Sequence, residues 1–316
     1  GELQKGGTRS YSKVFGDKLV KLARRNKQII AITAAMTDGT GLSTFEEKYP
    51  HRFFDVGIAE QHSLTFAGGL AVSGKKPFVA IYSTFMQRAL DQIIHDIALQ
   101  KLPVVLCLDR AGLVGEDGAT HHGVFDLSYL KLIPNLMIMA PTCAEEMEQM
   151  LEFAAVWQEG PIAIRYPRGH AVSAERTLPE LVPEKAVIVN SGSKIAIIAT
   201  GKALQDGIVL RKLLVNSDSN LEPLLINPRF IKPIDTDLLE SLKESATLIV
   251  TIEDNVLCGG FGESIKSFYC NSPLHVLSYG IPDEFVTHGK TELLRKRLKL
   301  LPEQIFEQLT PYLNQL

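Results

Sequence analysis

Short, β-rich apolar runs alternate with stretches of helical periodicity along most of the sequence, and this alternation constrains the fold more than any other feature. It is typical of an α/β fold whose sheet is mostly parallel, because parallel strands need a helical crossover between them. We therefore predict a doubly wound sheet in the first half of the chain. Its predicted strands are 28–33, 78–83, 104–109, 136–140 and 162–166.

Two helices of this first half carry clear local signals. The segment 11–25 places Val14, Leu19 and Leu22 on one face, as an amphipathic helix requires. The segment 142–157 opens with Thr142-Cys-Ala-Glu145, the spacing of a capping box, in which Thr142 and Glu145 satisfy each other's backbone donors.

The alternation stops at 170–185, which contains two prolines and no sustained period, and then starts again. We predict a linker there, followed by a second and smaller doubly wound domain. Its predicted strands are 194–200, 222–227, 247–252 and 274–278, and its helices are 203–214, 236–243, 262–268 and 291–298. The predicted organisation is a linker remnant at 1–9, a first domain at 10–169, the linker at 170–185 and a second domain at 186–316.

The length, composition and charge of the chain agree with two domains that each bury a hydrophobic core, and they exclude several classes of protein. A chain of 316 residues that is 45% hydrophobic and 22% charged, with a net charge of -3, has the composition of an ordered globular protein. Lysines and arginines are spread along the sequence rather than clustered, so we expect no nucleic-acid partner. No apolar run reaches the roughly 20 residues of a membrane helix, so we expect no membrane partner. The irregularly spaced cysteines predict free thiols in a reducing compartment, the cytoplasm or an organelle, and no metal site: Cys107, Cys143, Cys258 and Cys270.

Glu60 follows a short apolar strand and lies just before the predicted helix 63–73. Carboxylates at the carboxyl edge of an α/β sheet are well placed to meet a ligand. The alternative is that Glu60 only caps the helix, because acids favour that end. Gly68 and Gly69 inside the stretch indicate that another backbone or a ligand comes close.

Tyr82, Phe85 and Arg88 stand at the end of the next predicted strand. Aromatic rings at this edge can stack on a flat heterocycle, and an arginine can fork onto a phosphate. The alternative is that Phe85 is ordinary core and Arg88 a solvated helix residue.

The segment 110–123 packs four glycines, two acids and two histidines into a loop after a buried strand. Its glycines allow tight turns, and Asp117, His121 and His122 are groups that exchange protons near neutral pH. A structural loop and an active-site loop are both compatible with this pattern. A metal site is disfavoured because these side chains lack helical ligand spacing.

Arg165 and Arg168 end the last strand of the first domain. One of them can brace the domain through a salt bridge, and Arg168 stands where a ligand phosphate could be held.

Taken together, these segments resemble the 1-deoxy-D-xylulose-5-phosphate synthase family of transketolase-like enzymes. The resemblance to its central, pyrimidine-binding domain lies in DVGIAEQH, AIYSTFMQRALDQ, DRAGLVGEDGATHHG, FDLSYL, IPNLMIMAP and RYPRG. The resemblance to its C-terminal domain lies in NPRFIKPID, TIEDN, GGFGESI and GIPDEFVTHG, so that it covers the chain from Ser10 onward.

The resemblance implies a thiamine diphosphate enzyme that condenses pyruvate with D-glyceraldehyde 3-phosphate to 1-deoxy-D-xylulose 5-phosphate and carbon dioxide. The product feeds isoprenoid, thiamine and pyridoxal phosphate synthesis. Glu60 would hydrogen-bond the aminopyrimidine of the cofactor. Phe85 and Tyr82 would line that ring, and Tyr82 would also contact the substrates. Arg88 and Arg168 would hold the phosphate of the acceptor, while Asp117 and His121 would contact the substrates and assist proton transfer. The family also implies a homodimer, located in the cytoplasm or in a plastid stroma.

The family's N-terminal domain, which binds the diphosphate through Mg²⁺, has no counterpart here. The only similar pieces, Asp38-Gly39 and Glu116-Asp117-Gly118, lack the partner asparagine. With its Gly1 start and polar opening, the chain is expected to be a fragment that is inactive alone. Two alternatives remain open: a naturally separate subunit that needs a partner chain, or a silent dimerisation module. The second alternative predicts an exposed, unpaired Glu60.

Overall fold

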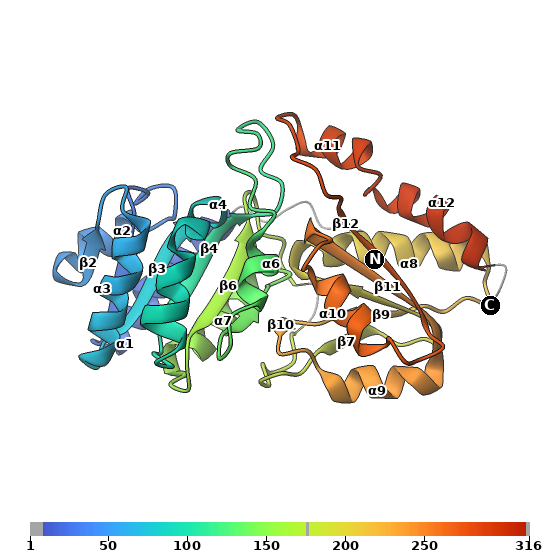
Figure 1. Ribbon diagram of the computed structural model, residues 1–316, viewed down its shortest axis with the longest axis horizontal. Coiled ribbons are helices and arrows are strands. Elements are labelled where there is room, and N and C mark those ends of the chain that lie inside the picture. Colours follow the sequence, from blue (N-terminus) through green and yellow to red (C-terminus); the bar gives the residue numbers. More distant parts are fainter. Residues whose placement is uncertain (1–8, 175–176, 314–316) are drawn as a thin grey trace. The chain divides into compact units, whose positions relative to one another are not determined.

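The computed structural model describes residues 9–174 and 177–313, and their contacts divide them into two compact units. The first unit comprises the described residues up to Ala111 together with Tyr129–Leu181. The second comprises Gly112–Ser128 and Val182 onward. Each unit is a mostly parallel sheet with alternating helices, so the predicted α/β fold class is confirmed (Figure 1).

In the first unit, six strands of the described chain pair in parallel in the order β5-β6-β4-β3-β1-β2. Helix α1 packs against α7, whereas α3 packs against β3 and η3. The elements of this unit are α1 (Tyr11–Arg25), β1 (Ile29–Thr33), α2 (Ser43–Lys48), η1 (Pro50–Arg52), β2 (Phe53–Asp55), α3 (Glu60–Val72), β3 (Lys76–Tyr82), α4 (Ser83–Met86), η2 (Gln87–Ala89), α5 (Leu90–Gln92), η3 (Ile93–Ala98), β4 (Val105–Ala111), β5 (Met137–Met139), α7 (Ala144–Val156) and β6 (Ile162–Pro167).

In the second unit, the strands pair in the order β12-β11-β8-β9-β7, and β7 alone of these runs antiparallel to its neighbour. Helix α6 (Asp126–Lys131) begins in this unit and ends in the first. The remaining elements are β7 (Val187–Asn190), β8 (Lys194–Ala199), η4 (Gly201–Ala203), α8 (Leu204–Ser217), β9 (Leu224–Asn227), β10 (Phe230–Lys232), α9 (Thr236–Ser245), β11 (Ala246–Val256), α10 (Phe261–Phe268), β12 (His275–Ile281), α11 (Thr291–Arg297) and α12 (Pro302–Leu313).

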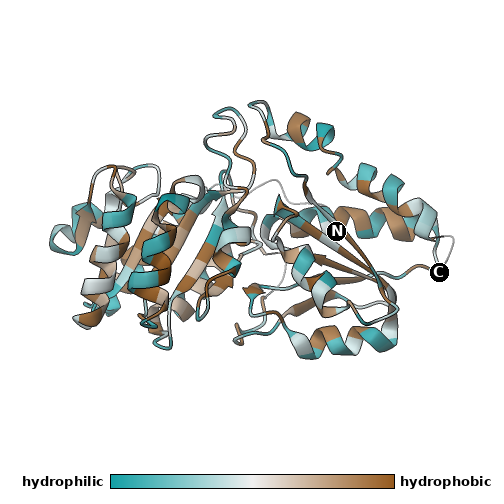
Figure 2. Ribbon diagram, in the orientation of Figure 1, coloured by the Kyte–Doolittle hydropathy of each residue, from teal (hydrophilic) through white to brown (hydrophobic). Residues whose placement is uncertain are grey.

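The strands carry the core of each unit. In Figure 2 they are mostly brown, whereas the helices show mixed brown and teal faces. Strands β1 and β3 are buried at every residue, because helices cover both faces of a doubly wound sheet. The carboxyl ends of β1, β3, β4 and β6 consequently form one edge, from which the following loops start.

The predicted capping box of α7 is wrong in its partner. Glu146, not Glu145, accepts the Thr142 N–H at 2.8 Å and the Thr142 hydroxyl at 2.6 Å. Glu145 instead accepts the N–H of Ala174. The helix begins at Ala144, two residues later than predicted, so the acid one residue further on is the one in reach of Thr142.

Candidate functional site

Glu60 is the first residue of α3 and is only 3% exposed. Its Oε1 accepts a hydrogen bond from Nη1 of Arg88 at 2.8 Å. Glu60 is the acid of the first turn of α3, as the capping alternative expects, although Ala59 is the N-cap residue and the helix has no side-chain cap hydrogen bond. Glu60 is therefore a buried carboxylate that accepts a charge-assisted hydrogen bond. It lies at the edge formed by the carboxyl ends of the strands in the first unit.

Tyr82, Phe85 and Arg88 form an array next to Glu60. The rings of Tyr82 and Phe85 stack at 5.8 Å between centroids, with 17° between their planes. The Arg88 guanidinium lies 5.2 Å from the centre of the Phe85 ring, within the range of a cation–π contact. The structure thus brings together four of the residues that the sequence singled out, although Arg88 lies 28 positions from Glu60 along the chain.

Arg110 belongs to the same array and was missed as a site residue. Its guanidinium lies over the Tyr82 ring at 3.9 Å from the centroid. Its backbone has a φ of 61°, which is uncommon for a residue other than glycine. Arg110 directly follows the predicted strand 104–109, and this place at a strand end was the signal that the sequence offered. In the structure, Asp109 pairs with Tyr82 in the register of β3 with β4.

Arg168 follows β6 directly and is exposed, two strands away from β3 in the same sheet. Asp117 and His121 lie in the segment Gly112–Ser128, which belongs to the second unit. Asp117 is exposed and His121 partly exposed, and His121 Nδ1 is 2.9 Å from the Thr120 hydroxyl. The predicted site residues therefore divide between the two units. Glu60, Tyr82, Phe85 and Arg88 lie close together in the first unit, whereas Asp117 and His121 lie in a loop of the second unit.

Gly68 and Gly69 differ in their surroundings. A Cβ at Gly68 would lie 3.2 Å from the backbone oxygen of Asp96, so a backbone does come close there. A Cβ at Gly69 would meet no described atom within 4 Å.

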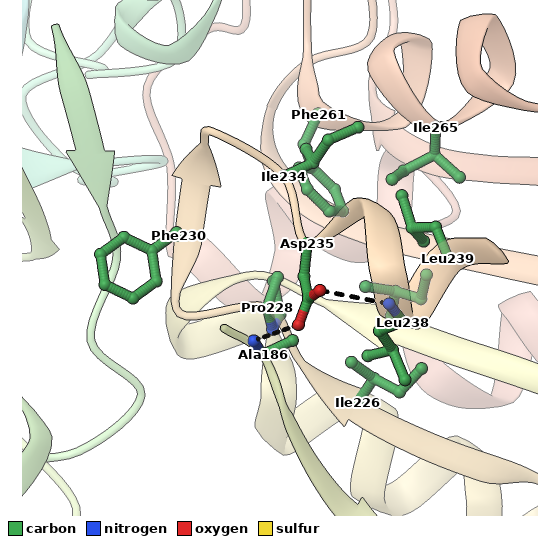
Figure 3. Close-up of a pocket in the computed structure, with 11 residues that line it drawn as sticks. Ala186, Ile226, Pro228, Phe230, Ile234, Asp235, Leu238, Leu239, Phe261 and Ile265 are labelled. Atoms are coloured by element: carbon green, nitrogen blue, oxygen red, sulfur yellow. Dashed lines mark hydrogen bonds between the residues drawn. The ribbon is translucent and has the colours of Figure 1, made fainter. Parts of the chain in front are cut away.

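A cavity in the second unit is almost wholly apolar (Figure 3). Its one carboxylate, Asp235, already accepts the N–H groups of Ala186 and Leu238. Since its polar atoms are engaged, this cavity offers less chemistry than the Glu60 array, and we do not take it as the site. Within the described residues, no cluster of His, Cys, Asp or Glu is arranged to hold a metal ion.

Asp109 is fully buried beside the array and accepts the Ser12 hydroxyl at 2.6 Å. Its Oδ1 and the hydroxyl of Tyr166 have no hydrogen-bond partner among the described residues. Burial raises the pKa of Asp109 from 3.8 to about 7, and the hydrogen bond from Ser12 and the charge of Arg110 oppose this only in part.

We expect the stability of the chain to fall as pH rises toward 7, because of Asp109. The native state holds the Asp109 proton up to about pH 7, whereas the unfolded state releases it near 3.8. The free energy of unfolding should therefore decrease between about pH 4 and 7, by on the order of 2 to 4 kcal/mol. Urea unfolding at several pH values measures this, and Asp109→Asn should flatten the slope. An equal slope in both proteins would contradict the assignment.

Two α/β units with a buried, arginine-paired glutamate at a sheet edge define the class of this chain. Residues 8–172 match the family model described as the transketolase pyrimidine-binding domain, and residues 184–305 match the transketolase C-terminal domain. Because the first match alone spans more than half of the sequence, the chain belongs to the transketolase family.

Individual relatives show which enzymes of the transketolase family this chain is similar to. Proteins from Clostridium perfringens and Syntrophomonas wolfei, both named 1-deoxy-D-xylulose-5-phosphate synthase, are 49% and 48% identical to it over 300 and 311 residues. These alignments cover 94% and 96% of this chain but 48% of each relative, so the chain spans about half the length of the relatives it matches.

Solved structures support the same fold. A chain titled split gene transketolase, inactive beta4 tetramer, superposes with a TM-score of 0.84 at 27% identity, covering 96% of this chain and 98% of the other. A transketolase from Campylobacter jejuni superposes with a TM-score of 0.82 at 17% identity, over 97% of this chain and 47% of its own. In the described part of the chain, no helix is both long and apolar enough to span a membrane.

Proposed function

We propose that this chain is the pyrimidine-binding and C-terminal part of a 1-deoxy-D-xylulose-5-phosphate synthase. In the complete enzyme it would help to condense pyruvate with D-glyceraldehyde 3-phosphate, giving 1-deoxy-D-xylulose 5-phosphate and carbon dioxide. The identity of 46 to 49% with proteins of that name supports the choice within the family. The single observation that carries the site is the buried Glu60 beside a stacked aromatic pair.

The residues of the array fit the aminopyrimidine ring of thiamine diphosphate. That cofactor, when bound, supplies a carbanion-forming thiazolium ring, which no protein side chain provides. Glu60 would share a proton with a ring nitrogen, since it is a buried carboxyl group at the open edge of the sheet. Phe85 would present an apolar face to the ring.

Arg88 has two roles to reconcile. It donates to Glu60 through Nη1, yet half of its side-chain surface stays exposed. Because a guanidinium carries five N–H donors, the same residue can hold Glu60 and still meet a phosphate. We propose that Arg88 and Arg168 bind the phosphate of the acceptor, and that Asp117 and His121 contact the substrates.

The separately encoded subunit remains a second candidate. One observation favours it: the solved split-gene transketolase chain is covered over 98% of its length, so a chain of this two-domain extent occurs as a gene product. In either case we propose that a diphosphate-binding domain with Mg²⁺ must be supplied by another part or chain. The expected homodimer, which light scattering would check, and the expected cytoplasmic location remain predictions.

We expect the purified chain alone to show no synthase turnover and only weak binding of thiamine diphosphate. The array would contact only the aminopyrimidine end of the cofactor, and the diphosphate would be held by the domain that we propose is supplied by another part or chain. Adding the N-terminal half of a relative in trans, with Mg²⁺, should restore product formation from pyruvate and D-glyceraldehyde 3-phosphate. Turnover by the chain alone would overturn the assignment, and so would a mixture that binds the cofactor and forms no product.

A further inference from the structure

The loop that carries Asp117 and His121 is closed by its own backbone. Gly112 and Gly123 exchange two hydrogen bonds, at 2.7 and 2.9 Å, and so join the two ends of the loop. Apolar side chains on both sides of it pack into a cluster of the second unit that includes Val124, Val256 and Leu294. The loop therefore starts and ends at fixed points.

His122 lies inside this loop and is only 2% exposed. Its Nδ1 is 3.1 Å from the backbone nitrogen of Val114. A backbone N–H can only donate, so Nδ1 must be the unprotonated nitrogen. The neutral ring then carries its proton on Nε2, which lies 3.2 Å from the carbonyl oxygen of Thr287. One imidazole thus joins the loop to a segment 165 residues away in sequence.

The segment 287–291 contacts the middle of the loop at two further points. The Gly289 N–H donates to the Gly115 carbonyl at 3.2 Å. A Cβ at Gly118 would lie 3.1 Å from the Cβ of His288, so the two backbones are in close contact there. These contacts position the turn that bears Asp117 and precedes His121.

We propose that His122 is a positioning residue, whose neutral, Nε2-protonated ring fixes the 112–123 loop on the 287–291 segment. It thereby sets where Asp117 and His121 stand. The proposal that His122 fixes the loop rests on this geometry alone. The consequence for the substrates rests on the function proposed above.

Burial of the His122 side chain favours the neutral ring. Burial lowers its pKa below 6.5, His121 lowers it further, and the Thr287 carbonyl and Asp117 oppose the shift. His288 and Lys290 are the basic residues of the facing segment. Because the folded pKa is lowered, the stabilisation is complete above about pH 6.5 and is lost as the pH falls toward the folded value. Protonated Nδ1 would point a proton at the Val114 N–H.

Backbone hydrogen exchange of the complete 316-residue chain tests the proposal. His122→Asn keeps an amide oxygen near the place of Nδ1, while His122→Gln loses that acceptor. At pH 7.5 we expect the Val114 amide to exchange roughly tenfold faster in His122→Gln than in the wild type, as expected for one lost hydrogen bond. In His122→Asn it should remain protected. His121→Gln is the matched control and should leave Val114 unchanged.

A pH series distinguishes this role from simple packing. After correction for intrinsic exchange, Val114 protection in the wild type should fall between pH 7.5 and 5.5, and in His122→Asn it should not. Equal protection in His122→Gln and wild type at both pH values would overturn the proposal. If His122→Gln does not fold, the nitrogen chemical shifts of the wild-type ring decide, because a protonated Nδ1 at pH 7.5 contradicts the geometry.

Turnover of the reconstituted enzyme distinguishes the role of His122 in fixing the loop from its effect on the substrate contacts of Asp117 and His121. Loss of protection in His122→Gln with a raised KM supports both His122 and the substrate contacts. Loss of protection with unchanged kcat and KM leaves the His122 contact intact and overturns its link to Asp117 and His121.

Discussion

Glu60→Gln should lower kcat of the reconstituted two-part enzyme roughly 10²- to 10⁴-fold, the usual contribution of one general acid–base group. Glutamine keeps the shape of the side chain and an oxygen that can accept from Arg88 Nη1, now 2.8 Å away. It cannot take up or release a proton. The measurement is steady-state turnover of pyruvate and D-glyceraldehyde 3-phosphate under saturating cofactor.

Glu146→Gln provides a matched control for Glu60. Glu146 is also buried in the first unit, and it accepts hydrogen bonds from Thr142. Its replacement should lower the melting temperature and leave kcat of the folded enzyme unchanged. If Glu60→Gln retained wild-type turnover, or if both variants lost it equally, Glu60 would have no special role in proton transfer.

Gly16→Ala should destabilise the first unit by about 3 kcal/mol or more, the upper range for overpacking a core. Gly16 lies inside α1, where a Cβ would come 1.9 Å from the backbone oxygen of Gly41. Gly41 cannot easily move, since a Cβ there would itself meet the backbone of Ser12 and its φ is 79°. Urea unfolding measures the change.

Gly69→Ala is the opposite case in another helix. A Cβ at Gly69 meets no described atom, so the substitution should bring only the helix propensity of alanine, a gain of about 1 kcal/mol. A loss of stability in Gly69→Ala, or none in Gly16→Ala, would contradict this account of the two helices.

The sequence was most informative where local pattern and packing agree. Helix α1 begins and ends at the predicted residues, because Ser10 caps it by accepting the Lys13 N–H and its apolar residues repeat at helical spacing. The resemblance to transketolase-like synthases, stated from motifs, is confirmed by the family models and relatives. The predicted domain boundaries and site roles remain predictions.

Elements held by tertiary contacts could not be predicted. Strand β7 is only partly buried and pairs at a sheet edge, so it carries no alternation. Helices α2 and α6 have six residues each, too few to show a helical period.

In the candidate site too, local patterns could be predicted from the sequence, whereas contacts between distant segments could not. Tyr82, Phe85 and Arg88 lie at and just after the end of one strand and were found together from the sequence. The contact of Arg88 with Glu60 joins two helical segments and needed coordinates. The left-handed backbone of Arg110 had no signal in the residue itself.

The assignment of Gly112–Ser128 to the second unit means that the chain visits that unit twice. A single scission in 170–185 would not divide the protein into two self-sufficient pieces. The C-terminal fragment would lose Val124 and expose Val256 and Leu294, while the N-terminal fragment would carry an orphaned loop. Such an interlaced order restricts gene rearrangement, since recombination at that junction would separate residues that share one core.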